Sequence, residues 1–344
     1  MAYTDIDKPD DYFNTVLYTG TGASNSVTGV GFQSDLLWFK NRSSALNHIL
    51  FDSVRGIDKY FYVNLNEAEG TSATILTAVG SDGFTVGANN NVNQSSNGIV
   101  AWNWLANGAG VSNTAGTISS TVSANTTSGF SIVSYTGNGT GGATIGHGLG
   151  VTPKMIIIKG RETTYNWVVG HNSLSTNWGK YLTLSTTDAV ETATNVFNDT
   201  APTSSLFSIG TALGVNTSSS NYIAYCFAEK KGFSKFGSYT GNGSADGTFV
   251  YTGFSPAFVM VKRTNTTSDW AIWDTARSTY NVVGNYLLPN TSGAEGNVSY
   301  IDVLSNGFKI RSSSVFNTAS DSIIYMAFAE HPFVTSTSVP TTAR

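Results

Sequence analysis

One pattern of landmarks occurs three times along this chain, and the repetition constrains the fold more than any other feature. Each copy begins with a tyrosine followed by Thr-Gly, at 18–20, 135–137 and 239–241. About twenty residues later an apolar run ends in a lysine, which is Lys40, Lys159 or Lys262. Successive copies begin roughly 100 to 120 residues apart, so they are too long for solenoid repeats and have the length of small domains.

The register of the copies includes charged residues. A carboxylate precedes a guanidinium by three residues in the pairs Asp52–Arg55 and Asp274–Arg277. One offset relates these pairs to each other and relates Lys40 to Lys262, whereas the middle copy has His171 and Leu174 in their place. A turn can close this spacing into a bidentate ion pair. A catalytic pair should not be lost from one copy, so we expect both pairs to be structural.

The residue types predict strands throughout. Short runs rich in β-branched and aromatic residues alternate with Gly, Asn, Ser and Pro clusters, and no long window has a helical apolar stripe. We therefore predict an all-β protein of three tandem antiparallel β-sandwich domains, jelly-roll or lectin-like, with extended termini. The expected units are an N-terminal arm, three repeats and a C-terminal tail, at 1–13, 14–107 (repeat 1), 108–231 (repeat 2), 232–332 (repeat 3) and 333–344.

Local patterns predict further details. The Ser119–Ser123 segment could pair with residues 129–134 as a hairpin, and the short join at 230–232 leaves little room for free motion between repeats 2 and 3. We expect Gly83 and Gly307 to supply positive φ in tight turns. The termini lack a core period, so they are expected either to fray or to dock as arms onto neighbouring subunits.

Charge and composition argue against several classes of function. Charged residues make up 12% of the chain, about half the usual share, and the net charge is −4 with no basic stripe. We expect no nucleic-acid partner, and with no run of 18 apolar residues we expect no membrane insertion. The start of the chain lacks the pattern of an export signal, so we expect synthesis in a cytoplasm. Such neutral polar surfaces are typical of extracellular, viral and adhesin β-proteins.

The residues of metal and nucleophile chemistry are scarce. His48, His147, His171 and His331 lie at non-equivalent positions without zinc-site spacing, so no metal and no cofactor are expected. His147 lies in a Gly-rich stretch that precedes a strand, which favours a β-turn over a phosphate-binding loop. The sole cysteine, Cys226, is expected to be buried and inert.

Two aromatic residues stand out as candidate ligand contacts. Most tryptophans lie in predicted core strands, but Trp178 and Tyr280 lie in loops among Asn and Ser. Exposed aromatic rings of this kind serve equally for glycan stacking and for subunit interfaces. A glycoside hydrolase would need two facing carboxylates, and the spacing cannot pair those available, which are Asp188, Glu191, Asp199, Asp246 and Glu295.

Several motifs together resemble a family of proteins. They are Tyr-Thr-Gly-Asn-Gly at 135–139, Gly-His-Gly-Leu-Gly-Val-Thr-Pro at 146–153 with its apolar strand ending in Lys159, the Asp-x-x-Arg-Gly segment at 52–56, Asp-Gly-Phe at 82–84, and Tyr-Met-Ala-Phe-Ala-Glu at 325–330. From about Asp11 to Arg344 the chain is similar to tandem-repeat virion proteins of tailed bacteriophages, especially marine ones. The resemblance implies a β-sandwich building block of a virion and transfers no catalytic residue.

The leading hypothesis is therefore a non-enzymatic virion structural protein. It would be a tail-fibre, tail-associated or capsid-surface component that contacts other virion proteins through its termini and contributes to host attachment. A homo-oligomer is expected, with a trimer favoured as the usual arrangement in fibres. The alternative is a lectin-like module that binds host surface glycans, and a polysaccharide depolymerase is a more distant third.

Overall fold

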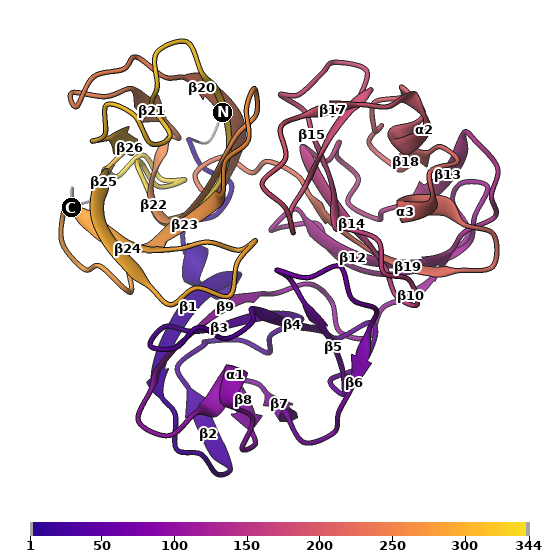
Figure 1. Cartoon of the computed structure of the whole chain (residues 1–344), viewed down its shortest axis with the longest axis horizontal. Coiled ribbons are helices and arrows are strands. Elements are labelled where there is room, and N and C mark those ends of the chain that lie inside the picture. Colours follow the sequence, from indigo (N-terminus) through magenta and orange to yellow (C-terminus); the bar gives the residue numbers. More distant parts are fainter. Residues whose placement is uncertain (1–2, 342–344) are drawn as a thin grey trace.

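The computed structural model describes residues 3–341, and this part of the chain is all-β with several antiparallel sheets. The three repeats form three lobes around a common centre (Figure 1). Each lobe contains one large sheet in which three strands of the repeat are neighbours. They are the strand that carries the Tyr-Thr-Gly tyrosine, the last long strand of the repeat, and the apolar strand that includes Lys40, Lys159 or Lys262. The predicted all-β class is confirmed.

Repeat 1 contains two sheets and a short helix. The large sheet has the order β1 (Phe13–Thr19), β9 (Gly98–Trp104), β3 (Leu36–Asn41), β4 (Ile49–Asp52), β5 (Lys59–Tyr62) and β6 (Gly70–Thr71). The small sheet has the order β2 (Asn25–Thr28), β8 (Gly83–Val86) and β7 (Leu76–Gly80), and the helix is α1 (Asn90–Asn93).

Repeat 2 follows the same plan with two extra strands at its start. Its large sheet has the order β10 (Val111–Asn113), β11 (Ser120–Asn125), β12 (Phe130–Thr136), β19 (Asn221–Phe227), β14 (Met155–Gly160), β15 (Val168–His171), β16 (Lys180–Thr183) and β17 (Glu191–Thr192). Its other elements are the paired strands β13 (Ala143–Gly146) and β18 (Leu206–Ile209), and the helices α2 (Thr194–Phe197) and α3 (Leu213–Asn216).

Repeat 3 differs, because a single sheet curls into a nearly closed barrel where two separate sheets were expected. Its order is β20 (Ser234–Thr240), β27 (Ser322–Pro332), β22 (Phe254–Arg263), β23 (Trp270–Asp274), β24 (Val283–Leu287), β25 (Gly296–Leu304), β26 (Gly307–Ile310) and β21 (Phe249–Tyr251). The long strand β25 connects the two halves, because it pairs with β24 near its start and with β26 near its end.

The central strands of the three large sheets, such as β9, β3, β19 and β14, are buried on both faces. In β9, Trp102 and Trp104 point into a cluster shared by all three repeats, whereas Ala101, which precedes them, belongs to the core of lobe 1. The shared cluster is aromatic, and Phe13 packs against Phe258 and Phe328 of repeat 3 with ring centroids 5.6 and 5.0 Å apart. A strand alternates its side chains between two faces. Each strand of this kind therefore contributes both to its own lobe and to the centre.

The repeated Tyr-Thr-Gly turn is held by a buried asparagine at the end of a short helical turn. In repeat 2 the Asn216 side chain accepts from the backbone N–H groups of Asn138 and Gly139 at 2.8 and 3.2 Å, and it donates to Thr140 and Gly210 carbonyls. Asn93 and Asn317 bind the turns of repeats 1 and 3 similarly. The tyrosine hydroxyl donates to the carbonyl preceding the asparagine, 2.8 Å away for Tyr135 and Tyr239.

Glycine is required in these turns for two reasons. A Cβ on the first glycine would lie 2.1 to 2.4 Å from a backbone oxygen in each repeat, which only glycine permits. The second glycine has φ of about +70° in each repeat, in the left-handed region that favours glycine. The motif that marks each copy is thus a folding element.

The expectation of positive φ is confirmed for Gly83, whose φ is 158°, and is wrong for Gly307, which is not among the glycines with positive φ. Both glycines also allow a close approach of the backbone. A Cβ on either would lie 2.0 Å from a carbonyl of the neighbouring strand, at Val27 or Val250.

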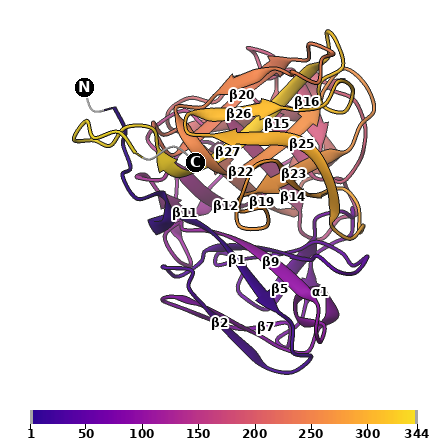
Figure 2. The same cartoon turned by 90° about the vertical axis from the view of Figure 1, so that its left-hand side faces the viewer.

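The connections and termini are tied to the body. The predicted hairpin after residue 108 is confirmed, because β11 pairs with β12. Thr4 donates to the Lys231 carbonyl at the join of repeats 2 and 3, and Ile6 is buried in the shared cluster. The N-terminal arm, over its described residues, therefore docks onto its own chain. It lies beside the C-terminal tail, where Ser336 binds Asp7, and both leave the body on the same side (Figure 2).

Candidate functional site

The predicted ion pairs Asp52–Arg55 and Asp274–Arg277 both form, and both are buried. In each pair the arginine Nε lies 2.5 Å from a carboxylate oxygen, and both side chains have no exposed area. The surrounding contacts show their role. Tyr225 of repeat 2 donates its hydroxyl to Asp52 at 2.7 Å, and Trp102 of repeat 1 donates its indole N–H to Asp274 at 2.9 Å. Each pair therefore joins two repeats.

A shared glutamate extends each pair across the boundary, or seam, between two repeats. At seam 1–2, Glu69 accepts from Arg55 at 3.1 Å and from Arg161 of repeat 2 at 2.9 and 3.0 Å. At seam 3–1, Glu295 accepts from Arg277 at 3.0 Å and from Arg42 of repeat 1 at 2.9 and 2.7 Å. These arginines and glutamates form equivalent networks at two of the three seams, in which Arg55 and Arg277 are fully buried and the other members are partly exposed.

Seam 2–3 has a different side-chain set at the equivalent positions. His171 and Leu174 replace the Asp–Arg pair, and Val190 takes the place of the shared glutamate, since its N–H binds Thr264 as those of Glu69 and Glu295 bind Arg161 and Arg42. Met326 stands where Trp102 and Tyr225 stand. Because Met326 has no polar hydrogen to donate, His171 instead contacts the Tyr325 carbonyl, with Nε2 3.2 Å from that oxygen. All members of the network changed together, which explains the departure seen in repeat 2.

The lysine that ends each apolar run also serves a seam. The ammonium groups of Lys40 and Lys159 each donate to two carbonyls of the following loop, and that of Lys262 donates to one. Each ammonium also donates to one carbonyl of a neighbouring repeat. The carbonyls of the neighbouring repeat belong to Ser292, Asn66 and Thr187, for Lys40, Lys159 and Lys262 respectively. Each lysine is fully buried. Burial disfavours the charged form and lowers each pKa to about 8.

Of the two candidate aromatic contacts, Tyr280 is exposed and Trp178 is buried. Trp178 is only 4% exposed and packs edge-on against Phe197 in the core of lobe 2, so its prediction as a surface residue is wrong. The backbone of Trp178 itself has φ of 57°, in the left-handed region. Tyr280 is 83% exposed, in the loop that follows β23.

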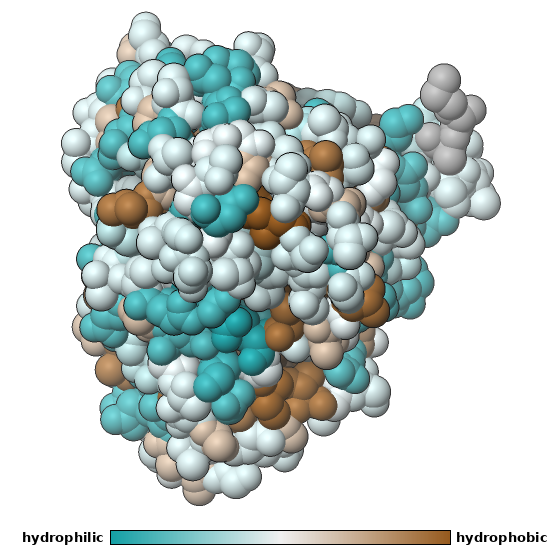
Figure 3. Space-filling model, turned by 90° about the vertical axis from the view of Figure 1, so that its right-hand side faces the viewer, coloured by the Kyte–Doolittle hydropathy of each residue, from teal (hydrophilic) through white to brown (hydrophobic). Residues whose placement is uncertain are grey.

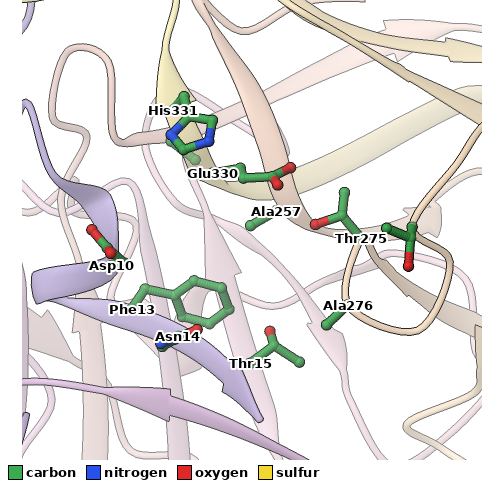
Figure 4. Close-up of a pocket in the computed structure, with 11 residues that line it drawn as sticks. Asp10, Phe13, Asn14, Thr15, Ala257, Thr275, Ala276, Glu330 and His331 are labelled. Atoms are coloured by element: carbon green, nitrogen blue, oxygen red, sulfur yellow. The ribbon is translucent and has the colours of Figure 1, made fainter. Parts of the chain in front are cut away.

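The loop that carries Tyr280 forms one wall of a pocket at seam 3–1. The pocket has a volume of about 380 Å³. Repeat 3 contributes Thr275, Ala276 and Thr279 from this loop, Ala257 from β22, and Ala329, Glu330 and His331 from β27. The opposite wall consists of Asp10 from the 3-10 turn η1 (Pro9–Asp11) and Phe13, Asn14 and Thr15 from β1. Figure 4 shows the Glu330 carboxylate and the Thr275 hydroxyl pointing toward each other, with the β1 residues facing them.

Two β-bulges shape this pocket. The pairing of β22 with β27 shifts register twice, because Ser255 pairs with His331, Pro256 with Ala329 and Phe258 with Phe328. Glu330 and Ala257 are the bulge residues, which have no paired residue on the opposite strand. Bulges re-aim side chains and occur preferentially near functional sites. In repeats 1 and 2 the corresponding pairs, β3 with β9 and β14 with β19, keep a regular register.

The lining of the pocket is acidic. It includes Asp10 and Glu330 and no lysine or arginine. Within the described part of the chain, no ion pair involves Glu330, and its Oε2 is buried without a hydrogen-bond partner. Across the pocket, Thr15 Oγ1 is likewise buried and unpartnered. Native proteins pair nearly all such atoms, so two on facing walls distinguish this pocket from ordinary packing.

Several of the other chemical candidates have structural partners. Glu191 accepts from the Tyr181 hydroxyl at 2.6 Å, and Asp246 pairs with Lys309 at 2.6 Å. His147 is buried in the stretch after β13, and its ring contacts the Thr203 carbonyl and accepts from the Leu149 N–H. Cys226 is buried, which raises the pKa of its thiol. Between residues 3 and 341 no three His, Cys, Asp or Glu side chains are grouped as metal ligands would be.

Sequence reasoning missed Glu330. It is the last residue of the Tyr-Met-Ala-Phe-Ala-Glu stretch at 325–330, and the sequence pattern there indicates only the end of a buried strand. The signal that could have found it is the Pro256 in the facing strand, since proline within a strand indicates an edge or a bulge.

The comparisons with known proteins identify a family without a described function. A family model described as a domain of unknown function, DUF7483, matches residues 8–332. Neither a curated protein nor a solved structure matches the chain. No helix in the described residues is long and apolar enough to cross a membrane.

Proposed function

The chain belongs to the DUF7483 family of domains of unknown function, and for this member we propose a non-enzymatic structural role in the virion of a tailed bacteriophage. It would be a tail-fibre, tail-associated or capsid-surface component, built from three β-sandwich-like lobes, that assembles with other virion proteins and contributes to host attachment. Assembly as a homo-oligomer, with a trimer favoured, is part of the proposal.

The observation that carries this proposal is where the buried charge lies. The buried arginines of the Asp–Arg pairs and the three buried lysines join one repeat to the next. A chain that commits its buried ionic groups to internal joints is built as a rigid part. Both termini leave one side of this body, which provides a face for attachment to a larger assembly.

The surface is consistent with this role. In Figure 3 most of the visible face is pale, the colour of Ser, Thr, Gly and similar residues, and the apolar patches are small and separate. Neutral polar surfaces of this type make many uncharged hydrogen bonds to neighbouring subunits or glycans.

A lectin-like role in host attachment is the second candidate, and the pocket at seam 3–1 favours it. The pocket combines hydrogen-bonding groups with a neighbouring exposed aromatic ring, Tyr280. A polysaccharide depolymerase would additionally need two carboxylates on either side of a glycosidic bond, and turnover of a polysaccharide would be its measurable sign.

The test of the structural role is a cryo-EM reconstruction of purified particles from the encoding phage. We expect density for a three-lobed body on the tail, on a fibre or on the capsid surface, joined to its neighbour through the face that carries the termini. Particles without this chain would contradict the proposal. Light scattering of the purified protein measures the number of chains in the assembly.

A further inference from the structure

We propose that the pocket at seam 3–1 binds a sugar that carries a positively charged amino group. This inference deepens the lectin-like candidate function and rests on it. The ligand class follows from the charge of the pocket, from the polar groups around it and from the ring beside it.

The charge of the pocket selects for a cation. Asp10 and Glu330 lie in the lining, which contains no basic residue apart from His331, and Glu330 has no ion-pair partner in the described chain. An uncompensated carboxylate in a recessed wall concentrates cations and repels anions. A protonated amine can therefore compensate Glu330, whereas a sugar carboxylate would add a like charge.

The remaining polar groups suit a polyol. Thr15 and Thr275 present hydroxyls from opposite sides of the pocket, whereas the amide nitrogen of Asn14 is already bound to the Gly29 and Val30 carbonyls. Hydroxyl groups both donate and accept, so they can satisfy the hydroxyls of a sugar ring, whereas a simple amine would leave them unused. The volume of about 380 Å³ lies at the lower end of ligand sites, which fits one sugar residue of a longer chain.

Tyr280 supplies the aromatic component. It follows Thr279, which lines the pocket, and it is the most exposed of the large hydrophobic side chains in the described chain. In repeat 1 the same offset that relates Arg277 to Arg55 places Asp58 at this position. Repeat 3 therefore combines the bulged Glu330 in the pocket with an exposed tyrosine next in sequence to the lining residue Thr279.

The experiment measures binding of three methyl glycosides to the full-length protein by saturation-transfer NMR and titration calorimetry. The glycosides are those of glucosamine, with a free amine, N-acetylglucosamine, which is neutral, and glucuronic acid, which is negative. We expect the glucosamine compound to bind at least tenfold more tightly than the neutral one, and the acidic compound not to bind.

Variants assign the binding to this pocket. Glu330→Gln keeps the shape of the side chain and removes its charge, so it should abolish the preference for the amine. Tyr280→Ala should weaken binding of both compounds. The matched controls are Glu229→Gln, whose carboxylate pairs with Lys235, and Tyr251→Ala, an exposed tyrosine of β21; both should bind like the unaltered protein. Near-UV circular dichroism confirms that each variant is folded.

Three results would overturn the proposal: no binding of the amino sugar, equal or tighter binding of the acidic sugar, or an unchanged preference for the amine in Glu330→Gln. A preference for the amine that persists in Glu330→Gln would leave the lectin-like function standing and remove only this pocket. The position of the protein in the virion is measured separately, so failure of the structural role is distinguishable from both.

Discussion

At the scale of single residues, the three buried lysines carry the clearest pH dependence. Their pKa in the folded protein is about 8, and in the unfolded chain it is about 10.4. Between these values the unfolded state binds more protons than the folded state, so the free energy of unfolding rises with pH. Above about pH 10, tyrosines act in the opposite direction, because burial raises the pKa of residues such as Tyr62, to about 12.

The corresponding prediction concerns Lys159→Met. Denaturant unfolding at pH 7.5, 8.5 and 9.5 should show the unaltered protein gaining stability, and the variant gaining about a third less. The variant should also be less stable at every pH by about 1–3 kcal/mol, because three carbonyls lose their shared donor. The exposed Lys180→Met is the control and should match the unaltered protein. An unchanged dependence on pH in Lys159→Met would contradict the prediction.

The asparagine that holds each opening turn gives a second prediction at this scale. Asn216 is buried and makes four hydrogen bonds to backbone groups. Asn216→Ala leaves these groups without partners, and we expect a loss of about 3 kcal/mol in the free energy of unfolding. Asn195→Ala, at an exposed position of the same repeat, should change it by less than about 0.5 kcal/mol. Equal losses in the two variants would show that the hydrogen bonds of the Asn216 side chain contribute nothing to the free energy of unfolding.

At the scale of elements, the seams show that one set of strands can be joined in two chemically different ways. Seams 1–2 and 3–1 use a network of two arginines and a shared glutamate, and seam 2–3 has Leu174, Val190 and Thr264 at the same positions. A buried charge left without its partner is strongly destabilising, whereas replacement of the whole set by apolar residues is often neutral. This asymmetry explains why the network residues differ together in repeat 2.

Glu69→Val tests this account, because valine is the residue that seam 2–3 has at this position. The change leaves Arg55 and Arg161 without their shared carboxylate, and we expect a loss of about 3–5 kcal/mol, measured by denaturant unfolding. The control Asp11→Asn removes an ion pair with Lys8 at the surface and should cost at most about 1 kcal/mol. The account fails if the two losses are the same.

At the scale of the whole molecule, three lobes share a central core that no lobe can form alone. The inner faces of the large sheets contribute Trp102, Tyr225 and Met326 to one cluster. The single chain thus creates internally the kind of threefold arrangement that was expected from three chains. The expected trimer of chains stays a prediction for mass measurement.

This shared core predicts that repeat 2 does not fold independently. Expressed alone, residues 108–231 would expose the apolar face that carries Ile132, Ile157 and Trp167. We expect the fragment to self-associate and to bind a hydrophobic dye, whereas the full chain unfolds in one transition. Light scattering and near-UV circular dichroism check both. A monomeric fragment with a cooperative transition would show that the lobes are independent domains.

The sequence by itself determined the elements of this protein and their threefold order. Strand composition, the Tyr-Thr-Gly turns and the apolar runs ending in lysine are local patterns, so they predicted the all-β class, the hairpin after residue 108 and the Asp–Arg pairs. Only the tertiary structure decided which faces meet. It buried Trp178, joined the repeats around one core, curled repeat 3 into a barrel and placed Glu330 opposite Thr15. These outcomes depend on contacts between residues far apart in sequence and on bulges that shift register, and periodicity along one strand does not encode either.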